Sequence, residues 1–268
     1  MEDLDAGQEF LRLLDAVRVL RGPNGCPWDR EQTHESLTPY LIEETYEAVE
    51  AIEEGRPEKI EDEMGDILLQ VLLHSQIAGE NDEFDIAHVC RRLREKLIRR
   101  HPHVFSELEV SGIAQIWRNW EQIKRSEPGY TERASALDGV PKSLPALARA
   151  VKISKKAART GFDWSDVVPI LDKLREETAE LESAIASGDK EGIEEEIGDL
   201  LFTVINISRH RDIDPEKALR AMLEKFSGRF RAIEQWASEH GLSLEEMTIE
   251  EMDRLWEQAK TAKNGDRG

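Results

Sequence analysis

Residues 43–71 read EETYEAVEAIEEGRPEKIEDEMGDILLQV, and residues 176–204 read EETAELESAIASGDKEGIEEEIGDLLFTV. The second stretch lies 176 − 43 = 133 residues after the first, and fifteen of the 29 aligned positions are identical. The similarity continues outward on both sides, where Gly25-Cys26-Pro27-Trp28 matches Gly161-Phe162-Asp163-Trp164 and Trp120-Glu121 matches Trp256-Glu257. A repeat with the length of a domain predicts two tandem copies of one folding unit, not a solenoid.

Apolar residues recur every three to four positions along nearly the whole chain, which predicts an all-α fold. We expect helices over residues 10–20, 37–54, 57–78, 86–100, 113–125, 147–159, 167–187, 191–210, 215–240 and 249–262. Residues 127–145 hold three prolines and two glycines, the composition of a linker. The expected organisation is therefore a first helical domain over 1–126, a linker over 127–145 and a second helical domain over 146–268.

Composition excludes several classes of protein. The 268 residues include 36 Lys and Arg against 56 Asp and Glu, so the formal net charge is 36 − 56 = −20, which repels bare nucleic acid. No stretch approaches the roughly 20 apolar residues of a membrane span. Because the first residues are acidic and the two cysteines form no CxxC pair, we expect a cytoplasmic protein. The net charge and the lack of a long apolar stretch predict that it has no nucleic-acid or membrane partners.

Each copy carries the same acidic motif, E-E-x-x-E, then fifteen residues, then E-x-x-D. Residues three or four apart share one face of a helix, and Gly55 and Gly188 mark a turn between the two halves of each motif. Each copy is thus expected to form an antiparallel helical hairpin in which four carboxylates converge. The candidate metal ligands are Glu44, Glu47, Glu63 and Asp66 in the first copy and Glu177, Glu180, Glu196 and Asp199 in the second.

The acids border apolar residues, since Asp66 precedes Ile67-Leu68-Leu69 and Asp199 precedes Leu200-Leu201-Phe202. Carboxylates that converge beside a core repel one another unless a divalent cation neutralises them. Ligation by oxygen alone favours Mg²⁺, with Mn²⁺ as the alternative. The competing interpretation is a solvated acidic face, and the repetition of the spacing favours metal. A di-iron centre is disfavoured because neither hairpin has a Glu-x-x-His pair, and no phosphate-binding G-x-x-x-x-G-K-[ST] loop occurs.

Cations and tryptophans recur downstream of each acidic set. Lys225 and Arg229 are four residues apart, as are Lys96 and Arg100, and Trp256 with Lys260 repeats the spacing of Trp120 with Lys124. Such pairs are able to bind phosphate oxygens and stack on a base, although tryptophans are more often core residues. Lys173 lies one turn before Glu177 and is placed to reach either a phosphate or an acid.

These motifs together resemble the MazG family of nucleoside triphosphate pyrophosphohydrolases, across nearly the whole chain. The motifs that carry the resemblance are Leu41-Ile42-Glu43-Glu44-Thr45-Tyr46-Glu47, Glu63-Met64-Gly65-Asp66, Arg99-Arg100-His101-Pro102-His103-Val104-Phe105 and Gly161-Phe162-Asp163-Trp164. The resemblance implies two tandem all-α pyrophosphatase domains that form four-helix-bundle packing in a homodimer. It also implies Mg²⁺-dependent hydrolysis of NTPs and dNTPs to the monophosphate and diphosphate, with broad base tolerance, in nucleotide-pool housekeeping or stress response.

In the family, catalysis is assigned mainly to the second domain. The resemblance places the catalytic set at Glu176, Glu177, Glu180, Glu196 and Asp199, and the substrate contacts at Lys173, Glu176, Lys225, Arg229, Trp256 and Lys260. The first copy retains its acidic set, so a second working site there stays open. Two alternatives also remain: an enzyme of the same fold that is narrow for dUTP or dCTP, and a non-catalytic adaptor whose metal is structural. The sequence leaves undecided which of Glu176 and Glu177 orients the water and whether copies pair within or between chains.

Overall fold

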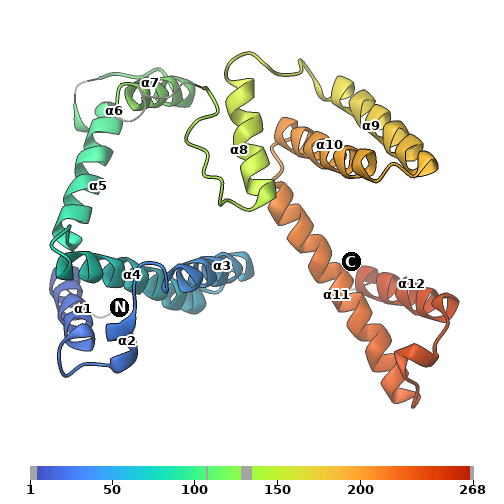
Figure 1. Ribbon diagram of the computed structural model, residues 1–268, viewed down its shortest axis with the longest axis horizontal. Helices are drawn as coiled ribbons and strands as arrows, with labels where there is room; N and C mark the ends of the chain where they lie inside the picture. The colour runs from blue at the N-terminus through green and yellow to red at the C-terminus, as the bar shows by residue number, and fades with distance from the viewer. Residues whose placement is uncertain (1–4, 107, 128–134, 266–268) are drawn as a thin grey trace. The chain divides into compact units, whose positions relative to one another are not determined.

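The computed structural model describes residues 5–106, 108–127 and 135–265, and this part of the chain is helical without a β-strand (Figure 1). The chain divides into two compact units, Met1–Thr131 and Glu132–Gly268. The expected linker lies partly outside the described residues, at 128–134. None of the helices that the structure describes combines the length and the apolar character that crossing a bilayer requires.

The first unit is built around the antiparallel pair α3 and α4, with α1 packed on α4. Its helices are α1 (Ala6–Arg21), α2 (Pro27–Glu31), α3 (Thr38–Glu54), α4 (Pro57–Glu80), α5 (Ile86–Arg100), α6 (Pro102–Phe105) and α7 (Ile113–Arg125). The core combines Leu14 and Val17 of α1 with Leu37 and with Leu72, Leu73 and Ile77 of α4. This core holds the start of α3 and the C-terminal half of α4. The end of the hairpin that carries the turn lies outside it.

The second unit repeats the hairpin with α9 and α10, which pack mainly on each other and on α8. Its elements are α8 (Ala146–Ala158), α9 (Val167–Ser187), α10 (Lys190–His210), α11 (Pro215–Glu239), the 3₁₀ turn η1 (Leu244–Glu246) and α12 (Ile249–Gly265). A separate apolar cluster joins α11 to α12 through Ile233, Ala237 and Met247, with Trp236 and Leu255 packed beside them. In Figure 1, α11 leads away from the α9–α10 hairpin instead of folding back along it.

Both hairpins turn through a glycine in the left-handed region. Gly55 ends α3 with φ 68°, and Gly188 ends α9 with φ 72°. A side chain at such a position costs energy, so glycine fixes where each first helix ends. The next helix then starts at once, with Pro57 in the first turn of α4 and the Asp189 side chain capping the Gly192 amide at the start of α10.

The all-α fold is confirmed, and the ten expected helices all occur with ends shifted by a few residues. Three short elements were not expected: α2, α6 and η1. Two of them, α2 and α6, begin at a proline. Pro102 follows the end of α5 and also occupies the first turn of α6, because its fixed φ suits a helix start as well as a helix end.

Candidate metal centres

Three carboxylates meet in each hairpin. One oxygen from each of Glu44, Glu63 and Asp66 lies within 4.8 Å of the others, and Glu177, Glu196 and Asp199 form the same arrangement in the second unit. In both, one acid comes from the first helix of the hairpin and two come from the second, so the turn geometry brings them together. This is the convergence that the repeated motif predicts.

The fourth acid of each predicted set lies beside these three. A hydrogen bond to Glu47 contributes to the raised pKa of Glu63, and Glu180 shares a hydrogen bond with Glu177. The charge of Glu180 also raises the pKa of Glu196. All eight predicted ligands are therefore close to one of the two clusters.

In the second hairpin a lysine stabilises the cluster. The Lys173 Nζ lies 2.7 Å from Glu176 and 2.8 Å from Glu177, whose side chain is buried. Hydrogen bonding to Lys173 holds the pKa of Glu177 below its ordinary value despite this burial, and the two glutamates raise the pKa of Lys173. Glu180 and Glu196 respond in the opposite direction: the hydrogen bond to Glu177 raises the pKa of Glu180, and desolvation raises the pKa of Glu196.

The first hairpin has no lysine at the matching position, 173 − 133 = 40, which is Tyr40. Desolvation, followed by the charge of Asp66, raises the pKa of Glu44, and desolvation raises the pKa of Glu63. Burial first, and then repulsion between the acids, therefore disfavour the ionised forms of Glu44 and Glu63.

The donor set fits a hard divalent cation. Every converging group is a carboxylate, and Glu63 and Glu196 each keep one buried Oε2 atom without a hydrogen-bond partner. A buried polar atom without a partner costs free energy. A cation such as Mg²⁺, which takes oxygen ligands, would satisfy both oxygens and remove the mutual repulsion.

The predicted cation and tryptophan positions cluster on other helices. The Arg229 guanidinium lies 5.2 Å from the centre of the Trp256 ring. The Phe226 ring lies 5.0 Å from the same ring and is tilted by 56° to it, and Lys260 pairs with Glu257 at 3.2 Å. The first unit repeats this with Arg100 and Lys124 at 5.3 Å and 5.0 Å from the Trp120 ring.

Among the described residues, no ion pair or hydrogen bond connects Lys225, Arg229 or Lys260 to the carboxylates of the second hairpin. The α11 and α12 helices pack on each other, and α11 also touches α8. The structure therefore brings together the acidic half of the predicted site and, separately, its basic and aromatic half.

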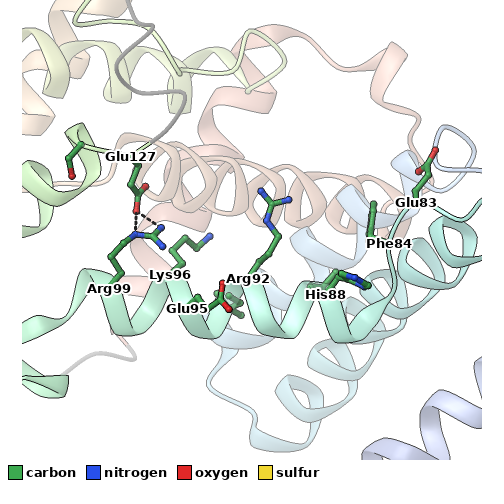
Figure 2. A pocket seen from close by; sticks show the side chains of 11 residues that line it. Glu83, Phe84, His88, Arg92, Glu95, Lys96, Arg99 and Glu127 are labelled. Atoms are coloured by element: carbon green, nitrogen blue, oxygen red, sulfur yellow. Dashed lines mark hydrogen bonds and ion pairs between the residues drawn. The ribbon is translucent and has the colours of Figure 1, made fainter.

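A groove follows α5 in the first unit (Figure 2). Its lining includes Phe84, His88, Arg92, Lys96 and Arg99, and Glu127 closes one end. Glu127 pairs with Arg99 at 2.7 Å and with Arg100, and these bonds lower its pKa to about 2. Lys96, one of the recurring cations, thus lies on an open polar surface.

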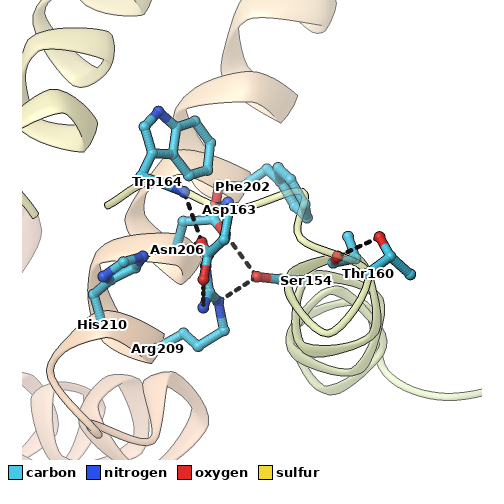
Figure 3. Close-up of polar contacts among 9 residues, drawn as sticks. Ser154, Thr160, Asp163, Trp164, Phe202, Asn206, Arg209 and His210 are labelled. Carbon is cyan, nitrogen blue, oxygen red and sulfur yellow. Dashed lines mark hydrogen bonds and ion pairs between the residues drawn. The ribbon is translucent and has the colours of Figure 1, made fainter. Parts of the chain in front are cut away.

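Sequence reasoning missed a polar network at the base of the second hairpin (Figure 3). Asp163 accepts hydrogen bonds from Arg209 and from the Trp164 backbone amide at 2.9 Å, and His210 lies 3.1 Å away. The Arg209 Nε donates to the Ser154 Oγ at 2.7 Å, and this hydroxyl donates to Asn206. The bonds to Arg209 lower the pKa of Asp163 to about 2. The available signal was the repeated Gly-x-x-Trp motif, where Asp163 replaces Pro27 of the first copy.

Comparison with known proteins places these features in one family. The model of the MazG nucleotide pyrophosphohydrolase domain matches residues 32–105 and 165–233. The chain is 46% identical over 256 residues to the nucleoside triphosphate pyrophosphohydrolase/pyrophosphatase MazG of Thermotoga maritima, covering 96% of this chain and 97% of that protein. It is 43% identical over 252 residues to the nucleoside triphosphate pyrophosphohydrolase of Escherichia coli K12, covering 93% and 96%.

A solved structure, that of a mazG-related protein from Thermotoga maritima, aligns with a TM-score of 0.38 and 26% identity. It covers 44% of this chain and 98% of that one. The two segments matched by the family model contain both carboxylate hairpins, and two relatives match nearly the full length at above 40% identity. This chain therefore belongs to the MazG family of nucleotide pyrophosphohydrolases.

Proposed function

We propose that this protein hydrolyses nucleoside triphosphates, ribo and deoxy, to the monophosphate and diphosphate, with little preference among bases and with the main site in the second hairpin. The observation that carries the proposal is the convergence of Glu177, Glu196 and Asp199 on a rigid helical hairpin inside a chain of this family. The names of the two full-length relatives support the reaction.

Glu177, Glu180, Glu196 and Asp199 would hold Mg²⁺, and the first hairpin offers Glu44, Glu47, Glu63 and Asp66 for the same purpose. When bound, the cation supplies neutralisation of the triphosphate charge and polarisation of the bond to be cleaved. Mn²⁺ has the same preference for oxygen ligands and is the alternative.

The protein's own groups in the second hairpin have different roles. Lys173 keeps Glu177 ionised and fixes its position, so Glu177 is suited to metal ligation. Glu176 holds the other side of the same ammonium group, and its side chain is 57% exposed. An exposed carboxylate beside the cluster can accept a proton from an attacking water, so we assign the orientation of that water to Glu176.

The basic and aromatic residues are suited to the rest of the substrate. Lys225 and Arg229 would neutralise the leaving diphosphate, and Trp256 offers a ring on which any base can stack. Stacking does not read hydrogen-bonding groups, which agrees with broad base tolerance. Lys260, one turn beyond Trp256, adds a further charge for the phosphates.

A homodimer is the second part of the proposal. The outer face of α10 exposes Ile197, Leu201 and Val204 by 47%, 55% and 46%, and α11 exposes Leu219, Met222 and Phe226 to a similar extent. Rows of this size at helical spacing are rarely left in water. A second copy would cover them by four-helix-bundle packing and would carry its own α11–α12 cations to the acidic hairpin, which lacks them within one chain.

A nucleotide panel tests the reaction. The eight common NTPs and dNTPs, together with oxidised and deaminated forms, are assayed for diphosphate release with Mg²⁺ or Mn²⁺. Similar kcat/KM values across bases support the proposal. Turnover of dUTP or dCTP alone would instead indicate an enzyme with narrow base specificity. Absence of diphosphate release from every nucleotide would indicate a non-catalytic adaptor whose metal is structural.

Complementation between chains tests the shared site. Glu196→Gln and Arg229→Ala chains are each expected to be nearly inactive. Exchange of subunits in an equal mixture should restore about a quarter of wild-type activity, because about half of the dimers are then mixed and each mixed dimer carries one intact site of two. If mixing restores nothing while subunit exchange is demonstrated by mass spectrometry, the site is not shared.

A further inference from the structure

Two histidines of the first unit form a direct hydrogen bond. His34, in the segment between α2 and α3, places its Nδ1 atom 2.6 Å from the Nδ1 atom of His74 on α4. The rings stack with their planes 3° apart and their centres 5.0 Å apart. This bond requires one Nδ1 to carry a hydrogen and the other to accept it, so it exists only while at least one ring is neutral.

The pair lies against a polar part of the interior. The His74 Nε2 atom is buried without a partner, and so is the Oε1 atom of Gln70, one turn earlier on α4, whose residue is 5% exposed. Burial lowers the pKa of His74, and the charge of His34 lowers it further. A second proton on the pair is therefore disfavoured in the folded state.

The second copy shows that the fold does not need these histidines. The matching positions are 34 + 133 = 167 and 74 + 133 = 207, which are Val167 and Ile207. Val167 is 8% exposed and is the first residue of α9, whereas His34 lies four residues before the start of α3. The second copy thus has apolar residues at both positions, whereas the first copy has a bond that depends on protonation.

We propose that the His34–His74 pair is a proton-operated latch that fixes the segment entering α3 against α4 and releases it on acidification. The segment carries its own hydrogen bonds, from the Thr38 Oγ1 to the His34 carbonyl at 3.1 Å and from the Leu37 amide to the Thr33 carbonyl at 3.2 Å. Because α3 supplies Glu44 and Glu47, the geometry of the first carboxylate cluster depends on the protonation of this pair.

The surrounding charges do not replace this link. Arg21 of α1 pairs with Glu80 of α4 at 2.7 Å, and Arg30 of α2 donates to the Pro23 carbonyl at 3.2 Å. Glu35 beside His34 is exposed, and the other ionisable groups of α2 and α3 that lie nearest to His34 in the sequence are Asp29, Glu31 and Tyr40. Of all these, none contributes to the shift of His74, which comes from burial and from His34.

The direction of the pH effect follows from linkage. The folded pKa of His74 lies below the ordinary value of about 6.5, so the latched state binds fewer protons than the released state. The contribution of the histidine pair to the stability of the latched state is complete above pH 6.5 and is lost as the pH falls below that value. The population of the released state should rise at most about tenfold for each pH unit, the limit for uptake of one proton.

Hydrogen exchange on the full chain tests the latch. Peptides covering residues 33–45 and 166–178 are followed by mass spectrometry between pH 7.5 and 5.5, with intrinsic rates corrected. We expect the protection of peptide 33–45 against hydrogen exchange to fall by up to about tenfold for each pH unit. The protection of peptide 166–178 should stay unchanged and serves as an internal control. The double variant His34→Val and His74→Ile, which installs the residues of the second copy, should abolish the response, whereas His88→Gln on the exposed surface of α5 should retain it.

An equal acid response in both peptides, or a response that survives in the double variant, would overturn the latch. If the double variant does not fold, NMR titration of the wild-type imidazoles decides instead. We expect His74 to take up its proton only below pH 6.5, and a His74 imidazole that titrates at 6.5 or above contradicts the proposal.

Discussion

The two hairpins share their acids, their spacing and their turns, yet they treat the same charge differently. In the second hairpin Lys173 pairs with Glu176 and Glu177 and lowers the pKa of Glu177. In the first hairpin Tyr40 occupies that position and instead packs edge-on against Trp28, so burial and repulsion raise the pKa of Glu44. The two copies thus differ at the glutamate of the first helix, whose pKa is lowered in the second copy and raised in the first.

The polar contacts at the ends of the hairpins away from the turns also differ between the copies. The second has the Asp163–Arg209 network that extends to Ser154 of α8, whereas the first has the Arg21–Glu80 pair and the two histidines. Duplication therefore preserved the ligand geometry and left the supporting charges free to diverge. Differences in activity between the copies should follow these supports and not the ligands themselves.

The largest expected effect separates the two clusters. Glu196→Ala should lower diphosphate release by about a thousandfold or more, as loss of a ligand to a catalytic metal does. The matched variant Glu63→Ala should change it only a few-fold. Both are checked by steady-state kinetics, with circular dichroism confirming unchanged helicity. Equal losses in the two variants would show that both hairpins work.

Lys173 is expected to matter next. Lys173→Met removes two charge-assisted hydrogen bonds and should lower kcat/KM roughly ten- to a hundredfold. Because the lysine holds the pKa of Glu177 down, its loss should also move the acidic limb of the pH–rate profile to higher pH. Lys190→Met, an exposed lysine in the first turn of α10, is the control. If kcat/KM falls at every pH while the acidic limb of the profile stays in place, Lys173 acts on substrate alone.

The Asp163 network should contribute to stability. Asp163 has a folded pKa of about 2 against an ordinary 3.8, so its contribution is present above pH 3.8 and is lost as the pH falls towards 2. Asp163 is exposed, so solvent screening reduces the contribution implied by this shift to between about 1 and 1.5 kcal/mol. Asp163→Asn should lower the unfolding free energy of the second unit by about that amount at pH 7, measured by urea denaturation. Glu80→Gln should act on the first unit instead, and a loss shared by both units would contradict this separation.

The smallest effect concerns the turns. Gly55→Ala and Gly188→Ala place a side chain at φ near 70°, which costs about 1 kcal/mol. A Cβ atom meets nothing within 4 Å at either position, so the cost should be backbone strain alone and equal in both copies. Thermal denaturation of the two variants checks this, and unequal shifts would indicate that one turn is supported by further contacts.

Much of the site could be predicted from the sequence, because the spacing of residues along a helix determines which side chains share a face. Glu63 and Asp66 must share a face at three residues apart, and the glycine turns decide where α4 and α10 run back along α3 and α9. The Asp163–Arg209 pair was not readable, since its members lie 46 residues apart and no periodicity relates them. The same holds for His34 and His74, which are separated by 40 residues.

The sequence by itself determined two helical copies, the repeated acidic motif of each hairpin and the family resemblance, because each depends on local spacing that repeats. Only the tertiary structure decided how each acid is charged, since a pKa depends on burial and on partners that arrive from other helices. It also decided that the cations of α11 and α12 lie apart from the carboxylates within one chain. No spacing rule fixes the angle at which α11 leaves α10.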